Sequence, residues 1–344
     1  MLKNWLFIFV KINSYMPLIL LPICAYKALD NVFFAGITIV LWRLLTYYKY
    51  TTLNFVLRNF IVRIMLLCLL LTVSMLLHID IYFKTIIVLS LSSVIPLYIA
   101  PDKVTIRTSK SMNFFLIISG MVIAGLFITR VTFLNYYFIT VTALLFFVGK
   151  SSSFNKNRLI FTKLYICDVF NVFVHNLHYY LFAFSIPLIA YRYSGNYYMS
   201  GITCALSWIL FLPKDYFIDH LMKFLDLRKI IGIGFIITAA LLIIIGFSTD
   251  IFVVCICLLF QGASAGISEG FWGTEAIKNS PLQYWSIWKL GGILGALLGS
   301  LIAFYAGIEI LFILAAVLAF AGGIMNFCIR VFQKTNSGGF KIGY

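Results

Sequence analysis

Four polar side chains recur along one apolar segment of the sequence, residues 165–191. Asp168, Asn171, His175 and His178 are spaced at i, i+3, i+7 and i+10, which places them on one face of a helix. Histidine takes up and releases a proton near neutral pH. The stripe therefore predicts a proton-carrying site, and the alternative interpretation is that these side chains only hydrogen-bond to neighbouring helices and fix their packing.

A second polar group lies in the apolar segment 250–272. Gln261 shares one helical face with two serines, and Glu269 lies about 80° from Gln261 around the helix axis. A carboxylate that is removed from water takes up a proton more readily than an exposed one. Glu269 is therefore a candidate proton carrier, and a salt bridge with Lys278 or Arg63 is the competing interpretation.

The segment 282–306 combines a basic residue with two tryptophans. Lys289 lies well inside the segment, where it needs a partner or an aqueous cavity, and Trp285 and Trp288 flank it. Their rings either stack on an organic substrate or anchor the helix at the membrane interface. Small residues recur every four positions further along, which predicts close contact with another helix rather than a phosphate-binding loop.

The composition requires that these segments lie in a membrane. Apolar residues make up 62% of the 344 residues and charged residues 11%, and the mean hydropathy is +1.03. Soluble domains have roughly 45–50% and about 25%, so a soluble, disordered or coiled-coil protein is excluded. The seven cysteines show no metal-ligand spacing, and we expect no metal or cofactor. The apolar runs predict an all-α polytopic membrane protein with twelve helices: 3–27, 31–48, 60–78, 81–100, 112–130, 132–149, 165–191, 197–214, 229–248, 250–272, 282–306 and 308–331.

Most of the basic residues fall in the loops on one side of the membrane. With a cytoplasmic N-terminus, 20 of the 26 Lys and Arg residues, Lys214 among them, fall in inner segments, and only four fall in outer loops. Cytoplasmic loops of membrane proteins carry such an excess. We therefore expect both termini in the cytoplasm, and the net charge of +15 needs no nucleic acid as a partner.

An internal repeat divides the chain. Residues 22–41 and 187–206 align without a gap, with eight of 20 positions identical, among them Gly36 with Gly201. The copies are six predicted helices apart, so both halves have the same orientation. The same spacing matches three positions of the first helix with three of the seventh: Lys11 with Asn176, Asn13 with His178 and Tyr15 with Tyr180.

Two parallel six-helix repeats are the architecture of one large transporter superfamily, and the chain resembles the major facilitator superfamily. The polar residues 150–158 resemble its central cytoplasmic linker. In the second half, Asp219 and Arg228 occupy the acidic and basic positions of its loop signature, although the leading glycine is absent. The expected domains are 1–149 and 164–334, each a six-helix bundle, with the linker at 150–163 and a cytoplasmic tail at 335–344.

The resemblance implies roles for the residues singled out above. Helices 1, 4, 7 and 10 line the cavity in this family, and helices 2 and 8 rearrange during transport, which gives Gly36 and Gly201 a gating role together with the loop residues Asp219 and Arg228. The proton-coupling candidates are His175, His178, Asp168 and Glu269. The substrate-binding candidates are Lys11, Asn13, Tyr15, Asn171, Asn176, Gln261, Trp285 and Lys289.

These observations predict a secondary transporter that works by alternating access, coupled to protons or another ion, in the bacterial cytoplasmic (inner) membrane. The suspected cavity charges are balanced, which favours a small anionic, zwitterionic or neutral polar solute over a lipophilic cation. An exporter of drugs, secondary metabolites or siderophores is one alternative. A membrane-embedded transferase that uses the histidines, or a non-transporting partner such as an immunity factor, are alternatives of another class. We expect no enzymatic activity and, besides solute and ions, only membrane lipid as a partner.

Overall fold

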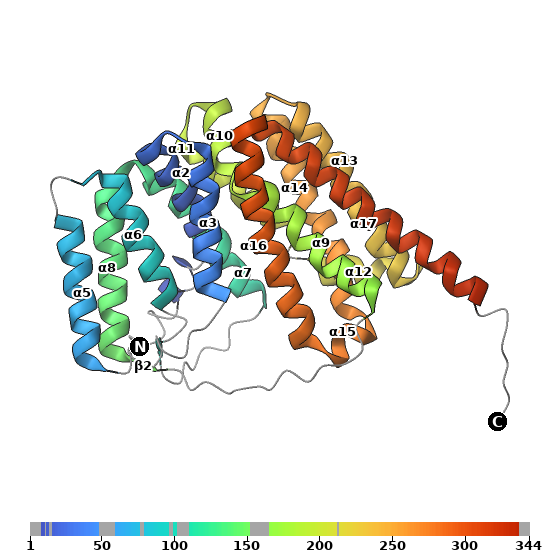
Figure 1. The fold of residues 1–344 in the computed structure, drawn as a ribbon, viewed down its shortest axis with the longest axis horizontal. Helices are drawn as coiled ribbons and strands as arrows, with labels where there is room; N and C mark the ends of the chain where they lie inside the picture. Colours follow the sequence, from blue (N-terminus) through green and yellow to red (C-terminus); the bar gives the residue numbers. More distant parts are fainter. Residues whose placement is uncertain are drawn as a thin grey trace. The chain divides into compact units, whose positions relative to one another are not determined.

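Helices make up nearly all of the structure. The computed structural model describes residues 8–10, 12–13, 16–47, 59–75, 79–95, 99–101, 110–151, 165–211 and 213–336 (Figure 1). The longer helices are α2 (Pro17–Leu29), α3 (Val32–Tyr47), α5 (Phe60–Met75), α6 (Ile81–Val94), α7 (Lys110–Phe127), α8 (Val131–Val148), α9 (Ile166–Ala183), α10 (Ile186–Ser194), α11 (Tyr197–Ile209), α12 (Lys214–Leu221), α13 (Leu227–Phe247), α14 (Ile251–Ser268), α16 (Pro281–Ala306) and α17 (Ile308–Asn336). Shorter elements are η2 (Ile128–Arg130), η3 (Glu269–Gly273), α15 (Glu275–Asn279), β1 (Ile99–Pro101) and β2 (Gly149–Ser151).

The described helices are those of an integral membrane protein. Seven helical segments are long and apolar enough to cross a membrane, and α2, α3, α5 and α6 contribute shorter apolar helices. Each of the twelve predicted segments overlaps at least one of the described helices. The arrangement of twelve spanning helices in two repeats stays a prediction.

Three of the predicted segments have interruptions or ends that change the local fold. The segment 165–191 is interrupted: α9 ends at Ala183 and α10 begins at Ile186, one residue before Pro187. Pro187 has no N–H group to donate to the Ala183 carbonyl, so the helical hydrogen bonds are broken at this point. The segment 197–214 ends earlier, at Ile209, and α12 is a separate short helix. The third departure is β1, which occupies the end of the predicted helix 81–100 and pairs with β2 in antiparallel fashion.

The chain divides into two compact units. Unit 1 consists of the described residues within 1–158 together with 183–205 and 296–308, and unit 2 of those within 159–182, 206–295 and 309–344. In unit 1, α2 packs against α3 and α6, and α6 packs against α8. In unit 2, α13 packs against α14, and Gly291 of α16 lies against the Phe173 carbonyl of α9, so that these two helices approach closely.

The repeated sequence builds the same turn twice within unit 1. Asp30 after α2 and Gly195 after α10 both adopt a left-handed conformation, with φ of 46° and 67°. Their N–H groups donate to the carbonyls of Tyr26 and Tyr191, which lie at matching positions of the repeat. The asparagine that follows each turn accepts a hydrogen bond from the backbone two residues on, at 2.8 and 2.9 Å. The tyrosines and asparagines that the two copies share at this turn therefore have the same local roles.

The repeated glycines make two close helix contacts within unit 1. Gly36 of α3 lies against Ser300 of α16. A Cβ atom at Gly201 of α11 would stand 2.7 Å from the Met121 carbonyl oxygen and 2.8 Å from the Gly125 Cα of α7. Both positions require the absence of a side chain, and their gating role stays a proposal.

This geometry makes a prediction for Gly201. Gly201→Ala should lower the free energy of unfolding by about 1–3 kcal/mol, because the new methyl group meets the backbone of α7. This loss opposes a gain in helix propensity of about 1 kcal/mol. The measurement is chemical unfolding of the purified protein in detergent. The control is Gly273→Ala, where the nearest atom to a new Cβ is 3.7 Å away. Equal stability of the two variants would contradict the close contact.

Candidate functional site

The predicted polar stripe of α9 is buried inside unit 2. Asp168, Asn171, His175 and His178 are each 5% exposed or less, and Gln261 of α14 is 1% exposed. Charged and polar groups in such surroundings are stable only when they are paired or hydrogen-bonded. Their partners therefore define what the cluster does.

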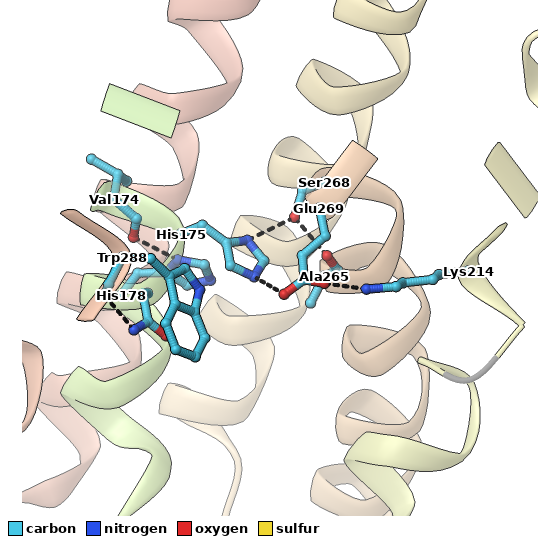
Figure 2. A network of polar contacts seen from close by, with 9 residues as sticks. Val174, His175, His178, Lys214, Ala265, Ser268, Glu269 and Trp288 are labelled. Atoms are coloured by element: carbon cyan, nitrogen blue, oxygen red, sulfur yellow. Dashed lines mark hydrogen bonds and ion pairs between the residues drawn. The ribbon is translucent and has the colours of Figure 1, made fainter. Parts of the chain in front are cut away.

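His175 connects α9 to a charged group at the end of α14. Its Nε2 lies 3.4 Å from the Glu269 carboxylate and its Nδ1 lies 3.1 Å from the Ser268 hydroxyl (Figure 2). The Lys214 ammonium, at the start of α12, forms an ion pair with the other oxygen of Glu269. Lys214 thus takes the place of the partners expected from sequence, Lys278 or Arg63. Glu269 is held from two sides, by a cation and by an imidazole.

The hydrogen atoms of this group can be placed in two ways. The Ser268 hydroxyl lies within reach of both His175 Nδ1 and the Ala265 carbonyl, at 3.1 and 2.8 Å, and it has one proton to donate (Figure 2). Because the Glu269 carboxylate only accepts, a neutral His175 donates from Nε2 and receives the Ser268 proton at Nδ1. A protonated His175 donates from both nitrogens, and Ser268 then donates to Ala265. The same heavy-atom geometry accommodates both protonation states.

A second ion pair lies at the start of α9. Asp168 is paired with Arg228 of α13, with 2.8 Å between Oδ1 and Nη2, and Arg228 also donates to the Cys167 sulfur at 3.3 Å. Arg228 was expected to act with Asp219 in the loop signature. Asp219 lies exposed on α12, and among the described residues no hydrogen bond or ion pair involves its side chain.

Asn171 forms a reciprocal amide pair with Asn326 of α17. Asn171 donates to Asn326 at 3.0 Å and accepts from it at 2.7 Å. Asn326 also donates to the Gly322 carbonyl, so both amides are well satisfied. Sequence reasoning missed Asn326, and the signal that could have found it is an asparagine inside an otherwise apolar span. It also missed Lys214, which it assigned to an inner loop.

His178 and Gln261 are incompletely paired. The Nδ1 of His178 lies 3.0 Å from the Val174 carbonyl, which only accepts, so the proton of a neutral ring is on Nδ1 and Nε2 is an acceptor. No described group bonds to this Nε2 or to either side-chain atom of Gln261. The His178 Nε2 can accept a proton, and the Gln261 amide can donate to or accept from a polar molecule. The rings of His175 and His178 lie edge to face, 5.4 Å apart.

Three further substrate-binding candidates, Asn176, Trp285 and Lys289, make no described contact with His175 or Glu269. Asn176 donates to the Trp288 carbonyl at 2.6 Å, and Trp285, 44% exposed, packs against Trp272 and Trp288. Lys289, in α16, is partly exposed and also makes an interaction.

The candidates of the first helix belong to unit 1. Asn13 accepts a hydrogen bond from the Tyr137 hydroxyl at 3.0 Å. Lys11 and Tyr15 lie outside the described residues. Within the described ranges, no three His, Cys, Asp or Glu side chains are grouped so that they could hold a metal ion.

The comparisons with known proteins support a transporter fold. No protein-family model matches the chain, and no curated protein matches its sequence. Among solved structures, a bacterial metal transporter is similar with a TM-score of 0.60 and 13% identity, over 95% of this chain and 97% of that one. The POT family transporter PepTSo is similar with a TM-score of 0.60 and 13% identity, over 96% and 99%. The chain therefore shares the fold of these two membrane transporters.

The ion pair of Lys214 with Glu269 makes a prediction for stability. Glu269→Gln should lower the free energy of unfolding by about 1–3 kcal/mol, because Lys214 is left without its carboxylate. In the double variant with Lys214→Gln, the loss should be smaller than the sum of the single losses by about 1 kcal/mol or more. Asp219→Asn, on the exposed face of α12, is the control and should change stability by less than about 0.5 kcal/mol. Strict additivity of the two single losses would contradict the pairing.

Proposed function

We propose that the chain is a secondary transporter of the major facilitator type, which moves a small organic solute by alternating access. The observation that carries the proposal is the likeness to two transporters over 95% and 96% of the chain. The local agreement of the two repeat turns supports two related halves. We place the protein in the bacterial cytoplasmic membrane with both termini in the cytoplasm, because of the bias of its basic residues.

The solute we propose is anionic, zwitterionic or neutral and polar. Recognition of a lipophilic cation requires a buried carboxylate without a cation of its own. In unit 2 the buried Asp168 is paired with Arg228, and Glu269, whose side chain is 13% exposed, is paired with Lys214. This pairing favours a solute that brings a negative or a neutral group.

We further propose that His175 carries the coupling proton. Protonation gives His175 a charge beside Glu269 and reverses the Ser268 hydroxyl, so the carboxylate has two cations instead of one. Glu269 can then release Lys214, which frees the start of α12. His178, with its open Nε2, is the neighbouring proton acceptor. A proton on α9 is thereby linked to the contact between α12 and α14.

The coupling proposal is tested by removal of each imidazole. His175→Gln and His178→Gln should leave the protein folded, because glutamine retains a donor and an acceptor. The variants should lose solute accumulation driven by a pH gradient while exchange of solute without a gradient persists. The measurement is flux into proteoliposomes with a panel of organic acids and amino acids. Unchanged gradient-driven flux in both single variants and in the double variant would contradict proton coupling. The polar stripe of α9 would then contribute only to helix packing.

The orientation is tested by topology reporters. A reporter that fluoresces only in the cytoplasm should be active when it is fused after Tyr344 and silent when it is inserted after Gly195. Gly195 suits insertion, because it lies in an exposed turn and a new Cβ there would meet no atom within 4 Å. Fluorescence from the Gly195 insertion would overturn both the orientation and the number of helices that precede it.

A further inference from the structure

Unit 1 contains contacts between the two halves of the sequence. It groups two segments of the second half with helices of the first half, and α2 packs against α10. Gly36 of α3 lies against Ser300 of α16, and Gly201 of α11 lies against Gly125 of α7. The loops beside these contacts are those that the bias of the basic residues assigns to the outer side. The two halves therefore meet at this end of unit 1.

Lys27 lies at the same end, beside the contact between α2 and α10. Its ammonium nitrogen is 5.4 Å from the ring centroid of Tyr191 and 5.2 Å from that of Tyr197. The two rings are stacked, with 4.2 Å between their centroids and 12° between their planes. An ammonium group over the outer face of one ring would be much closer to that ring than to the other. The near equality of the two distances places it beside the edges of both rings.

This position shows which atoms hold the ammonium group. The edge of an aromatic ring is positive, so a cation is attracted there only by the phenolic oxygen. Side-chain hydrogen bonds link Lys27 to both tyrosines, and the tyrosines to each other. Among the described residues, no ion pair joins Lys27 to a carboxylate. The two hydroxyl groups are therefore its partners, and hydrogen bonds from a charged donor are stronger than those between neutral groups.

The repeat does not duplicate this cluster. Val32 occupies the position of the first half that matches Tyr197 of the second half. The first half therefore lacks the second tyrosine that a stacked pair needs. The one cluster of this kind that the described residues form takes its cation from the first half and its two hydroxyl groups from the second.

We propose that Lys27, Tyr191 and Tyr197 form a lock that holds the outer ends of the two halves together during the transport cycle. Gly36 and Gly201 permit the close approach of the helices, and the lock supplies a specific attraction. Release of the ammonium group from the two hydroxyl groups frees α2 from α10 and α11, and this end can then open. The inference rests on the proposed transport function, for which it names gating residues.

Cys204 of α11 reports whether this end opens. It is buried and lies on the same face of α11 as Tyr197 and Gly201, since the three positions are spaced at i, i+4 and i+7. A buried thiol reacts with a polar reagent only when it becomes accessible. The test measures the rate at which a charged methanethiosulfonate reagent labels Cys204 in full-length protein whose other cysteines are replaced by alanine. Nanodiscs hold the protein and expose both sides of the membrane, so the rate does not depend on the orientation of the chain.

Loss of the lock should increase this rate. Lys27→Met should raise the labelling rate of Cys204 about tenfold, because the hydrogen bonds from the ammonium group are lost. The double variant Tyr191→Phe with Tyr197→Phe should have the same effect, since it keeps both rings and removes only the hydroxyl groups. Arg130→Gln removes an exposed basic residue from η2 of the same unit, and this control should label as the wild type.

A second reporter separates opening from unfolding. Cys257 is buried in α14 of unit 2, and as the single cysteine it should be labelled at the same rate in all variants. The lock is contradicted if Lys27→Met leaves the labelling of Cys204 unchanged, if the double phenylalanine variant labels as the wild type, or if Cys257 or the Arg130→Gln control shows the same increase.

Flux into proteoliposomes distinguishes this inference from the proposed function. Faster labelling of Cys204 in the lock variants of a protein that carries no solute would contradict the transport proposal and leave the lock in place. Solute flux together with unchanged labelling of Cys204 would contradict the lock alone.

Discussion

The lack of water in the membrane interior is the constraint on which this structure depends. Backbone groups there must bond within helices, and a charge must find its partner inside the protein. The chain satisfies the first requirement with nearly continuous helices. It satisfies the second in unit 2 by joining Asp168 to Arg228 and Glu269 to Lys214, in both cases with side chains from different helices. These pairs fix α9, α12, α13 and α14 relative to one another more specifically than apolar contacts alone.

Much of the local structure follows directly from the sequence. The apolar runs predicted the helices, and the spacing of Asp168, Asn171, His175 and His178 predicted one shared and buried helical face. The repeat predicted that residues at matching positions have the same structural role. The turns at Asp30 and Gly195, which match in the repeat, have the same left-handed geometry. The spacing of apolar and polar residues, the residues that form turns and the excess of basic residues in inner loops are all properties of residues that are close in sequence. A single sequence is therefore enough to detect them.

The partners of the polar residues could not be predicted in the same way. Lys214 and Asn326 are 55 and 155 residues from the groups that they bind, Glu269 and Asn171. Their pairing depends on how α12 and α17 pack against α14 and α9, which no local pattern encodes. Lys214 also follows the end of α11, so it was counted as a loop charge that marks topology. The interruption of the helix before Pro187 was missed because apolar residues continue through it.

The two units solve the problem of buried charge differently, and the difference bears on function. In unit 2 the acids Asp168 and Glu269 each have a basic partner, so a proton that arrives at His175 changes an existing balance within the protein. In unit 1 the buried Arg63 donates to a backbone carbonyl, that of Phe146, at 2.9 Å. A pair of opposite charges responds to a third charge that appears beside it, whereas a hydrogen bond to a neutral carbonyl responds much less. The proton-coupling role proposed for His175 follows from this difference.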